Sequence, residues 1–134
     1  MRKAFITLTT LFSFSLCAQN ITWQNVNLNV PFENTQAVFN LIDGFYSNIE
    51  IPEGIRVSLW SIEYKGQSEK ATHILNLAGA KESLVEFEAR KLTSEWDAYL
   101  SKLNSLTNRE GFSVTAGVTL VRYNIDKWQE TIAQ

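Results

Sequence analysis

Hydrophobic and polar positions follow a regular order along the chain from residue 22 onward. Alternation over 22–30 places Val26, Leu28 and Val30 on one side and asparagines on the other, which predicts a half-buried strand. Apolar positions three and four apart predict helices, and β-branched and aromatic runs bounded by glycine or proline predict strands. The elements expected in chain order are strand 22–30, helix 34–48, strand 55–64, strand 71–78, helical region 81–106, strand 112–123 and a short amphipathic tail at 124–134.

Capping patterns refine the helical regions. Ser94 followed by Asp97 is similar to a capping box, so region 81–106 is expected to form two helices with a joint near Thr93. Asn34 is expected to cap the first helix. Glycine-containing polar segments predict loops at residues 65–68 and 108–111.

The element order predicts the fold class. Strand, helix, strand, strand, helix, strand is the split βαβ, or ferredoxin-like, arrangement: an α+β fold with a four-stranded antiparallel sheet and helices on one face. The second strand is expected to be apolar on both sides, with Val57 and Leu59 against Trp60, Ile62 and Tyr64, and the last strand is similar. Such a sheet needs a second cover, which a second copy of the chain supplies by two-fold symmetry. A cystatin-like or NTF2-like α+β cone is the alternative.

The stretch from Arg56 to Tyr123 resembles the dimeric α+β-barrel superfamily. The resemblance rests on a long central hairpin, a glycine-bounded turn into a short helix, and an aromatic helix that begins Ser94-Glu95-Trp96. It implies a homodimer whose two sheets close into a barrel around a cavity. Members include cofactor-free monooxygenases, polyketide cyclases, haem enzymes and proteins without known activity. No catalytic residue of the superfamily maps onto this chain.

The first 18 residues have the pattern of a secretory signal peptide. Two basic residues precede an uncharged apolar run over 4–16, and a small residue, Ala18, lies at the expected cleavage position. The run is shorter than the ~20 residues that a membrane-spanning helix needs. We expect cleavage after Ala18, one α+β domain at 19–134, and a periplasmic or extracellular protein. Lipidation of Cys17 and a retained anchor are the alternatives.

The amino-acid composition argues against several classes of function. Hydrophobic residues make up 45% of the chain and charged residues 19%, which is typical of a folded domain. The net charge of −2 lacks the basic footprint of a nucleic-acid-binding protein. One cysteine excludes an internal disulfide framework, and one histidine excludes a multi-histidine metal centre within one chain. We therefore expect no metal, cofactor, nucleic-acid partner or stable membrane insertion.

Few residues are candidates for chemistry or binding. His73, the sole histidine, is a candidate general base, or a strand histidine that packs locally. Trp60 and Tyr64 share a predicted strand face and are candidates for an apolar ligand pocket or a dimer interface. Asn27 and Asn29 are candidates to bind a ligand oxygen, or belong to a solvated strand.

Two functions remain open at this point. The first is an exported homodimeric barrel that binds a small apolar ligand, with a lining of tryptophan and aliphatic residues. The second is a cofactor-independent monooxygenase or cyclase that acts on an aromatic or polyketide-like substrate. The enzyme predicts that His73, or an asparagine–tryptophan pair, points into the cavity beside a tyrosine. Export favours the first, because such enzymes typically act inside cells.

Overall fold

The computed structural model describes residues 21–121. The predicted signal peptide and amphipathic tail lie outside the described residues. The elements within them, in chain order, are β1 (Thr22–Asn29), η1 (Phe32–Asn34), α1 (Thr35–Ser47), β2 (Arg56–Ser61), β3 (His73–Gly79), α2 (Lys81–Arg90), α3 (Ser94–Leu106) and β4 (Asn108–Val118).

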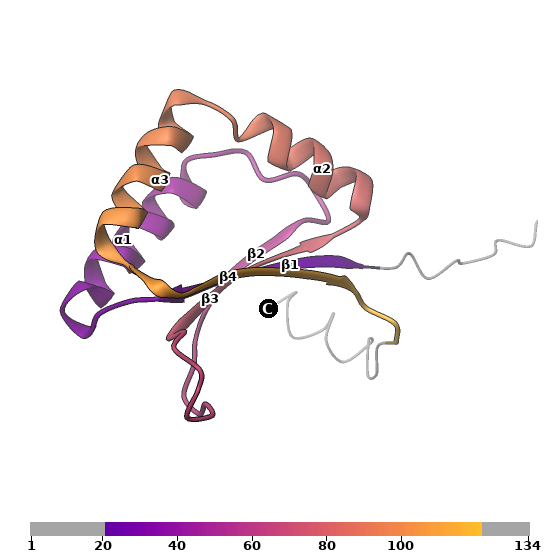
Figure 1. Ribbon diagram of the computed structural model, residues 1–134. Helices are drawn as coiled ribbons and strands as arrows, with labels where there is room; N and C mark the ends of the chain where they lie inside the picture. The colour runs from indigo at the N-terminus through magenta and orange to yellow at the C-terminus, as the bar shows by residue number, and fades with distance from the viewer. Residues whose placement is uncertain (1–20, 122–134) are drawn as a thin grey trace, which may run out of the picture.

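The four strands form one antiparallel sheet in the order β2-β3-β1-β4. The three helices lie on one side of this sheet (Figure 1). This connectivity confirms the predicted ferredoxin-like α+β fold, and the α+β cone was the wrong alternative. Two separate helices, α2 and α3, were also predicted correctly.

The hydrophobic core lies between the sheet and the helices. Strand alternation places Leu28, Leu75 and Leu77 on the helix side, and each is at most 3% exposed. The helices contribute side chains at helical spacing that are at most 5% exposed, among them Val38, Ile42, Phe87, Tyr99 and Leu103. Because this face of β1 and β3 is fully used by the core, the alternate residues of both strands point to the opposite face.

Two predicted caps act differently from the expectation. The side chain that caps α3 is Thr93, whose Oγ1 accepts a hydrogen bond from the Trp96 amide at 3.3 Å, so the cap lies one residue before Ser94. Asn34 precedes α1 but makes no side-chain cap there. Its Nδ2 donates to the carbonyl oxygen of Leu106 at 3.0 Å and so ties the start of α1 to the end of α3.

The two outer strands are shorter or shifted relative to the prediction. β2 ends at Ser61, and a last backbone bond from the Ile62 amide to the Thr72 carbonyl closes the ladder. β4 begins at Asn108, within the segment predicted as a loop, because a register shift opposite Asn27 and Asn29 accommodates extra residues. Gly111 permits this irregularity with a φ of 88°; a Cβ atom there would also lie 2.6 Å from Lys70 Cβ.

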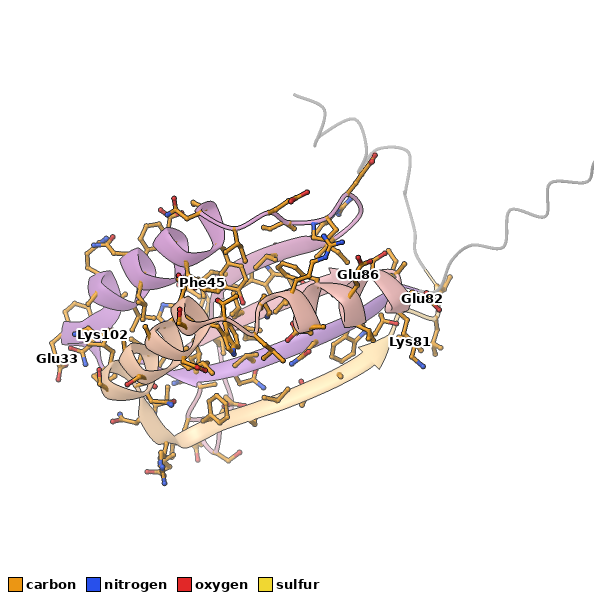
Figure 2. The ribbon with its side chains drawn as sticks, turned by 90° about the horizontal axis from the view of Figure 1, so that it is seen from above. Glu33, Phe45, Lys81, Glu82, Glu86 and Lys102 are labelled. Atoms are coloured by element: carbon orange, nitrogen blue, oxygen red, sulfur yellow. The ribbon has the colours of Figure 1, made fainter. Side chains whose placement is uncertain are left out.

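At its other end β4 stops at Val118, because its partner β1 begins opposite it at Thr22. The expectation that both outer strands are apolar on each side is therefore wrong. On the side away from the helices, β2 carries Arg56 and Ser58 besides Trp60. On the same side, β4 carries Ser113, Thr115 and Gly117. Val114 and Val118 lie on the helix side of β4 and remain half exposed, since β4 runs beside the helical layer (Figure 2).

Candidate functional site on the open face of the sheet

The sheet face away from the helices carries three rows of side chains that cross all four strands. We call this surface the open face, because no helix among residues 21–121 covers it (Figure 1). Residues directly opposite one another in neighbouring strands share a face, so the register defines each row. From β2 to β4 the rows are Arg56-Ala78-Trp23-Gly117, Ser58-Asn76-Asn25-Thr115 and Trp60-Ile74-Asn27-Ser113.

The middle row is polar throughout and is held together by an amide pair. Asn76 Nδ2 donates to Asn25 Oδ1 at 2.7 Å between the two central strands. Asn76 is only 9% exposed although no helix lies above it. Because Asn76 Nδ2 and Asn25 Oδ1 are hydrogen-bonded to each other, both atoms keep a partner when this part of the open face is buried away from water.

One outer row carries an indole over a glycine. A Cβ atom at Gly117 would lie 2.6 Å from Trp23 Cζ2, so the indole ring of Trp23 occupies the space beside this glycine of β4. Any larger residue at position 117 displaces that ring. The glycine therefore fixes where Trp23 lies on the open face.

The other outer row joins two of the predicted site residues. Trp60 and Asn27 both pair with Ile74, so they lie two strands apart, or about 10 Å. Trp60 is 48% exposed, and Asn27 Nδ2 donates to Ser113 Oγ at 2.9 Å. This arrangement presents an apolar ring and an amide on one surface, as a ligand site with a few polar groups requires.

The other predicted candidates lie elsewhere. Asn29 Nδ2 donates to the carbonyl oxygen of Glu110 at 2.8 Å, beside the register shift in β4, so this amide stabilises the irregular strand. Tyr64 follows the end of β2 and is 96% exposed, so it does not share a sheet face with Trp60. The predicted pairing of Tyr64 with Trp60 was wrong because β2 ends three residues earlier.

His73 points to the helix side of the sheet, opposite to Trp60 and Asn27. It alternates with Leu75 and Leu77, and its Nδ1 lies 2.8 Å from Thr72 Oγ1. Burial lowers the pKa of His73 below its ordinary value of 6.5. The structure therefore brings together Trp60 and Asn27 and leaves His73 on the far side of the sheet from them.

Two residues of the open face, Trp23 and Asn76, were missed by the sequence analysis, whereas Asn25 belongs to the predicted row of strand asparagines. Trp23 and Asn25 alternate with Asn27 and Asn29 on the same predicted strand, so the alternation itself placed them on one face. Alternation places Asn76 on the face of β3 opposite His73, but its pairing with Asn25 depends on the register between β1 and β3. That register is a tertiary property that the sequence pattern does not contain.

Residues 21–121 contain no group of three or more histidine, cysteine, aspartate or glutamate side chains that could hold a metal ion. No helix among them has the length and apolar character needed to cross a bilayer.

Comparison with known proteins supports the fold. No protein-family model and no curated protein matches the chain. Among solved structures, the chain is similar to a hydroxynitrile lyase from Passiflora edulis, with a TM-score of 0.55, 11% identity, and coverage of 78% of this chain and 98% of that one. It is also similar to a dimeric ferredoxin-like protein of unknown function from Thermobifida fusca, with a TM-score of 0.53, 8% identity, and coverage of 75% and 92%.

A third similar structure comes from Nitrosomonas europaea and carries a provisional name as an antibiotic biosynthesis monooxygenase. Its TM-score is 0.52 at 12% identity, with 78% of this chain and 92% of that chain covered. These neighbours are ferredoxin-like proteins of the dimeric α+β-barrel type, which agrees with the resemblance seen in the sequence. This chain has their fold.

Proposed function

We propose that the protein is a homodimer whose two open faces pack against each other and enclose a site for a small apolar ligand. The observation that carries the proposal is the make-up of the open face. Its central amides, Asn25 and Asn76, are already hydrogen-bonded to each other, while the indole of Trp60 remains 48% exposed. Burial of such a face removes apolar rings from water and leaves this amide pair satisfied.

The dimer is further supported by its neighbours and by the residue types involved. The similar structure from Thermobifida fusca is a dimeric ferredoxin-like protein. Tryptophan is enriched at protein interfaces and among the residues that contribute most to binding. In the proposed dimer the rings of Trp23 and Trp60 border the ligand site, and Asn27 supplies a polar contact at its edge.

The interface is tested by Trp60→Glu, with Val85→Glu as the matched control. Val85 lies on α2 in the helical layer and is 64% exposed, so its substitution adds the same charge away from the open face. Sedimentation equilibrium is expected to show dimers for the wild type and the control. Trp60→Glu is expected to raise the dissociation constant at least about 30-fold, the loss of one strong interface residue. Equal constants for all three proteins would exclude this interface.

The ligand is tested by native mass spectrometry of the gently purified dimer. Additional mass that survives in the wild type and is lost in Trp60→Ala would support a site beside this ring. A dimer that retains the same additional mass in Trp60→Ala would place the ligand elsewhere.

A cofactor-independent monooxygenase or cyclase is the second candidate, and one observation favours it. Asn27 and Trp60 lie in one row of the open face, as expected for the asparagine–tryptophan pair of this enzyme, although none of the three rows contains the tyrosine expected beside that pair. His73 lies on the other side of the sheet, so this enzyme would work without a histidine base. Dioxygen uptake with anthrone, a tricyclic aromatic ketone, that falls in both Asn27→Ala and Trp60→Ala would support it; uptake no faster than without protein would argue for binding alone.

We also propose that the chain is exported and cleaved after Ala18. The support is the basic, apolar and small-residue order of the first 18 residues. The mass of the protein recovered from its natural host tests this. A chain that begins at Gln19 is expected; an intact Met1, or a lipid attached to Cys17, would contradict it.

A further inference from the structure

The strand β4 carries an apolar stripe on the helix side of the sheet that no helix among residues 21–121 covers (Figure 2). The residues of β4 that alternate with the open-face residues Ser113 and Thr115 lie on this side. They are Phe112, Val114, Ala116 and Val118, and we call them the β4 stripe. The three larger side chains are 49–51% exposed, and no residue of β4 is fully buried.

The β4 stripe differs from the same face of the two central strands. On β1 and β3 this face holds Leu28, Leu75 and Leu77, which the helices cover and which are at most 3% exposed. The stripe continues this core sideways, because Val114 pairs with Val26, and Val26 packs against the core cluster. A contiguous apolar surface that borders a core and remains in water is typical of a contact site.

The stripe is also the only apolar side of β4. On the opposite side the strand presents Ser113, Thr115 and Gly117 to the open face. A segment that packs an apolar surface along β4 therefore fits the helix side better than the open face. The proposed open-face dimer leaves the stripe uncovered, because the sheet itself lies between the two surfaces.

The chain supplies a segment of matching character directly after β4. Residues 122–134 follow the described part of the chain. Ile125, Trp128 and Ile132 recur three and four residues apart, and every position between them is polar or charged, which predicts a helix with one apolar side. Asn124, just before this pattern, is a favourable N-cap residue.

The dimensions of the segment and the stripe agree. A helix over 124–134 would be about 16 Å long at 1.5 Å per residue. The stripe is roughly 20 Å long at about 3.3 Å per residue. The Thr119 amide still donates to the Ile21 carbonyl oxygen at 2.7 Å, so the chain can leave the sheet after Thr119. Residues 120–123 can span up to about 14 Å, enough to raise the chain by the ~10 Å diameter of a helix.

We infer that residues 124–134 form a helix that packs on the β4 stripe of the same chain. The helix runs antiparallel to β4, and Ile125, Trp128 and Ile132 form its contact side. It completes the helical layer over the one strand that α1, α2 and α3 leave uncovered. The inference concerns the helix side of the sheet and does not rest on the proposed open-face dimer.

The position of the segment is tested by paramagnetic broadening of methyl resonances in the full chain. A nitroxide label is attached at Glu130→Cys, which lies on the side of the predicted helix opposite Trp128 and so leaves the contact intact. Cys17→Ser makes this thiol the only one, whether or not the leader is cleaved.

The methyl resonances on the two faces of the sheet should respond differently. Those of Val114 and Val118 are expected to lose most of their intensity, whereas those of Ile74 and Ala78, on the open face, are expected to keep most of theirs. A mixture of isotope-labelled chains without nitroxide and nitroxide-labelled chains without isotope is expected to show no loss, because the contact lies within one chain.

The contact side is tested by Trp128→Glu, with Thr131→Glu as the matched control. Both substitutions add one carboxylate to a neutral position of the segment, but Thr131 lies off the apolar side. Trp128→Glu is expected to shift the methyl resonances of Val114 and Val118 and to lower the midpoint of thermal unfolding by at least about 4 °C. Thr131→Glu is expected to leave the midpoint within about 2 °C of the unsubstituted chain.

Three results of the broadening experiment would overturn the inference. Loss of intensity at Ile74 and Ala78 in place of Val114 and Val118 would put the segment on the open face. Loss in the mixed sample would mean that the segment contacts a second copy of the chain. No loss at either pair would leave the β4 stripe to a different partner. Each result is read from a folded chain with an intact contact side, so the outcome does not depend on the stability of Trp128→Glu.

Discussion

The two faces of β1 and β3 are built from neighbouring residues but serve different purposes. On the helix side, Leu28 and Leu77 are at most 2% exposed and belong to a continuous apolar core. On the open face, one residue away in sequence, asparagines pair with each other between two exposed or half-buried indoles. The comparison teaches that strand alternation stabilises the fold through one face and leaves the other face available for association.

The largest expected difference in unfolding free energy is between variants of two adjacent residues of β1. Leu28→Ala should lower the free energy of unfolding by about 3–5 kcal/mol, because it removes a fully buried side chain and leaves a cavity. Asn27→Ala should cost only about 1 kcal/mol, since it removes one hydrogen bond, to Ser113. Urea unfolding measures both. Comparable losses would mean that the open face contributes to folding as much as the core.

Two glycine-to-alanine substitutions should change the stability of the protein in opposite directions. Gly117→Ala places a Cβ atom 2.6 Å from Trp23 and should cost about 1–3 kcal/mol as the indole is displaced. Gly44→Ala lies within α1 with no atom inside 4 Å of the new Cβ, and should stabilise the protein by about 0.5–1 kcal/mol. Thermal unfolding of the two variants tests this. A Gly117→Ala variant that is more stable than the wild type would mean that the Trp23 ring does not depend on the space beside Gly117.

The Asn25–Asn76 pair should show a measurable coupling energy. A double-mutant cycle with alanine at both positions is expected to give about 1 kcal/mol, because the pair is partly shielded from water. The control is the exposed amide pair Gln36–Asn40 on α1, with a donor–acceptor distance of 2.9 Å and an expected coupling below about 0.5 kcal/mol. A coupling at Asn25–Asn76 no larger than the control value would contradict the shielded polar row.

These residues also show what could be predicted from the sequence. The fold followed from element order and alternation, because the period of hydrophobic positions determines which side of a strand is buried. The candidate site could be predicted from the sequence less completely than the fold. Trp60 and Asn27 were each named as candidates on separate strands, and Tyr64 was joined to Trp60 because the apolar run continues past Ser61, where β2 ends.

The remaining features depend on contacts between distant segments. The pairing of Asn25 with Asn76 requires the register of two strands about fifty residues apart, and the register shift in β4 requires Gly111 to lie against Lys70. The burial of Lys91 requires α1 and α2 to meet, while the local sequence shows only a cation at a helix end. Neither spacing nor propensity contains this information.

The smallest expected effect on stability is the pH-dependent contribution of His73, which lies on the helix side of the sheet. Because burial holds its pKa below 6.5 in the folded protein, the unfolded chain binds more protons between the two pKa values. The contribution of His73 to stability is therefore complete above about pH 7 and declines as the pH falls through its unfolded pKa of about 6.5 toward the folded pKa. The difference in unfolding free energy between wild type and His73→Gln should decrease on acidification; a constant difference would contradict a lowered pKa for the partly buried His73.

The most direct test of the account is the oligomeric state of the wild-type protein. Native mass spectrometry of the protein at micromolar concentration should show the mass of two chains, because the open face is expected to be covered by a second copy. A mass of one chain across the whole micromolar range would contradict the proposed dimer, and the enclosed ligand site with it.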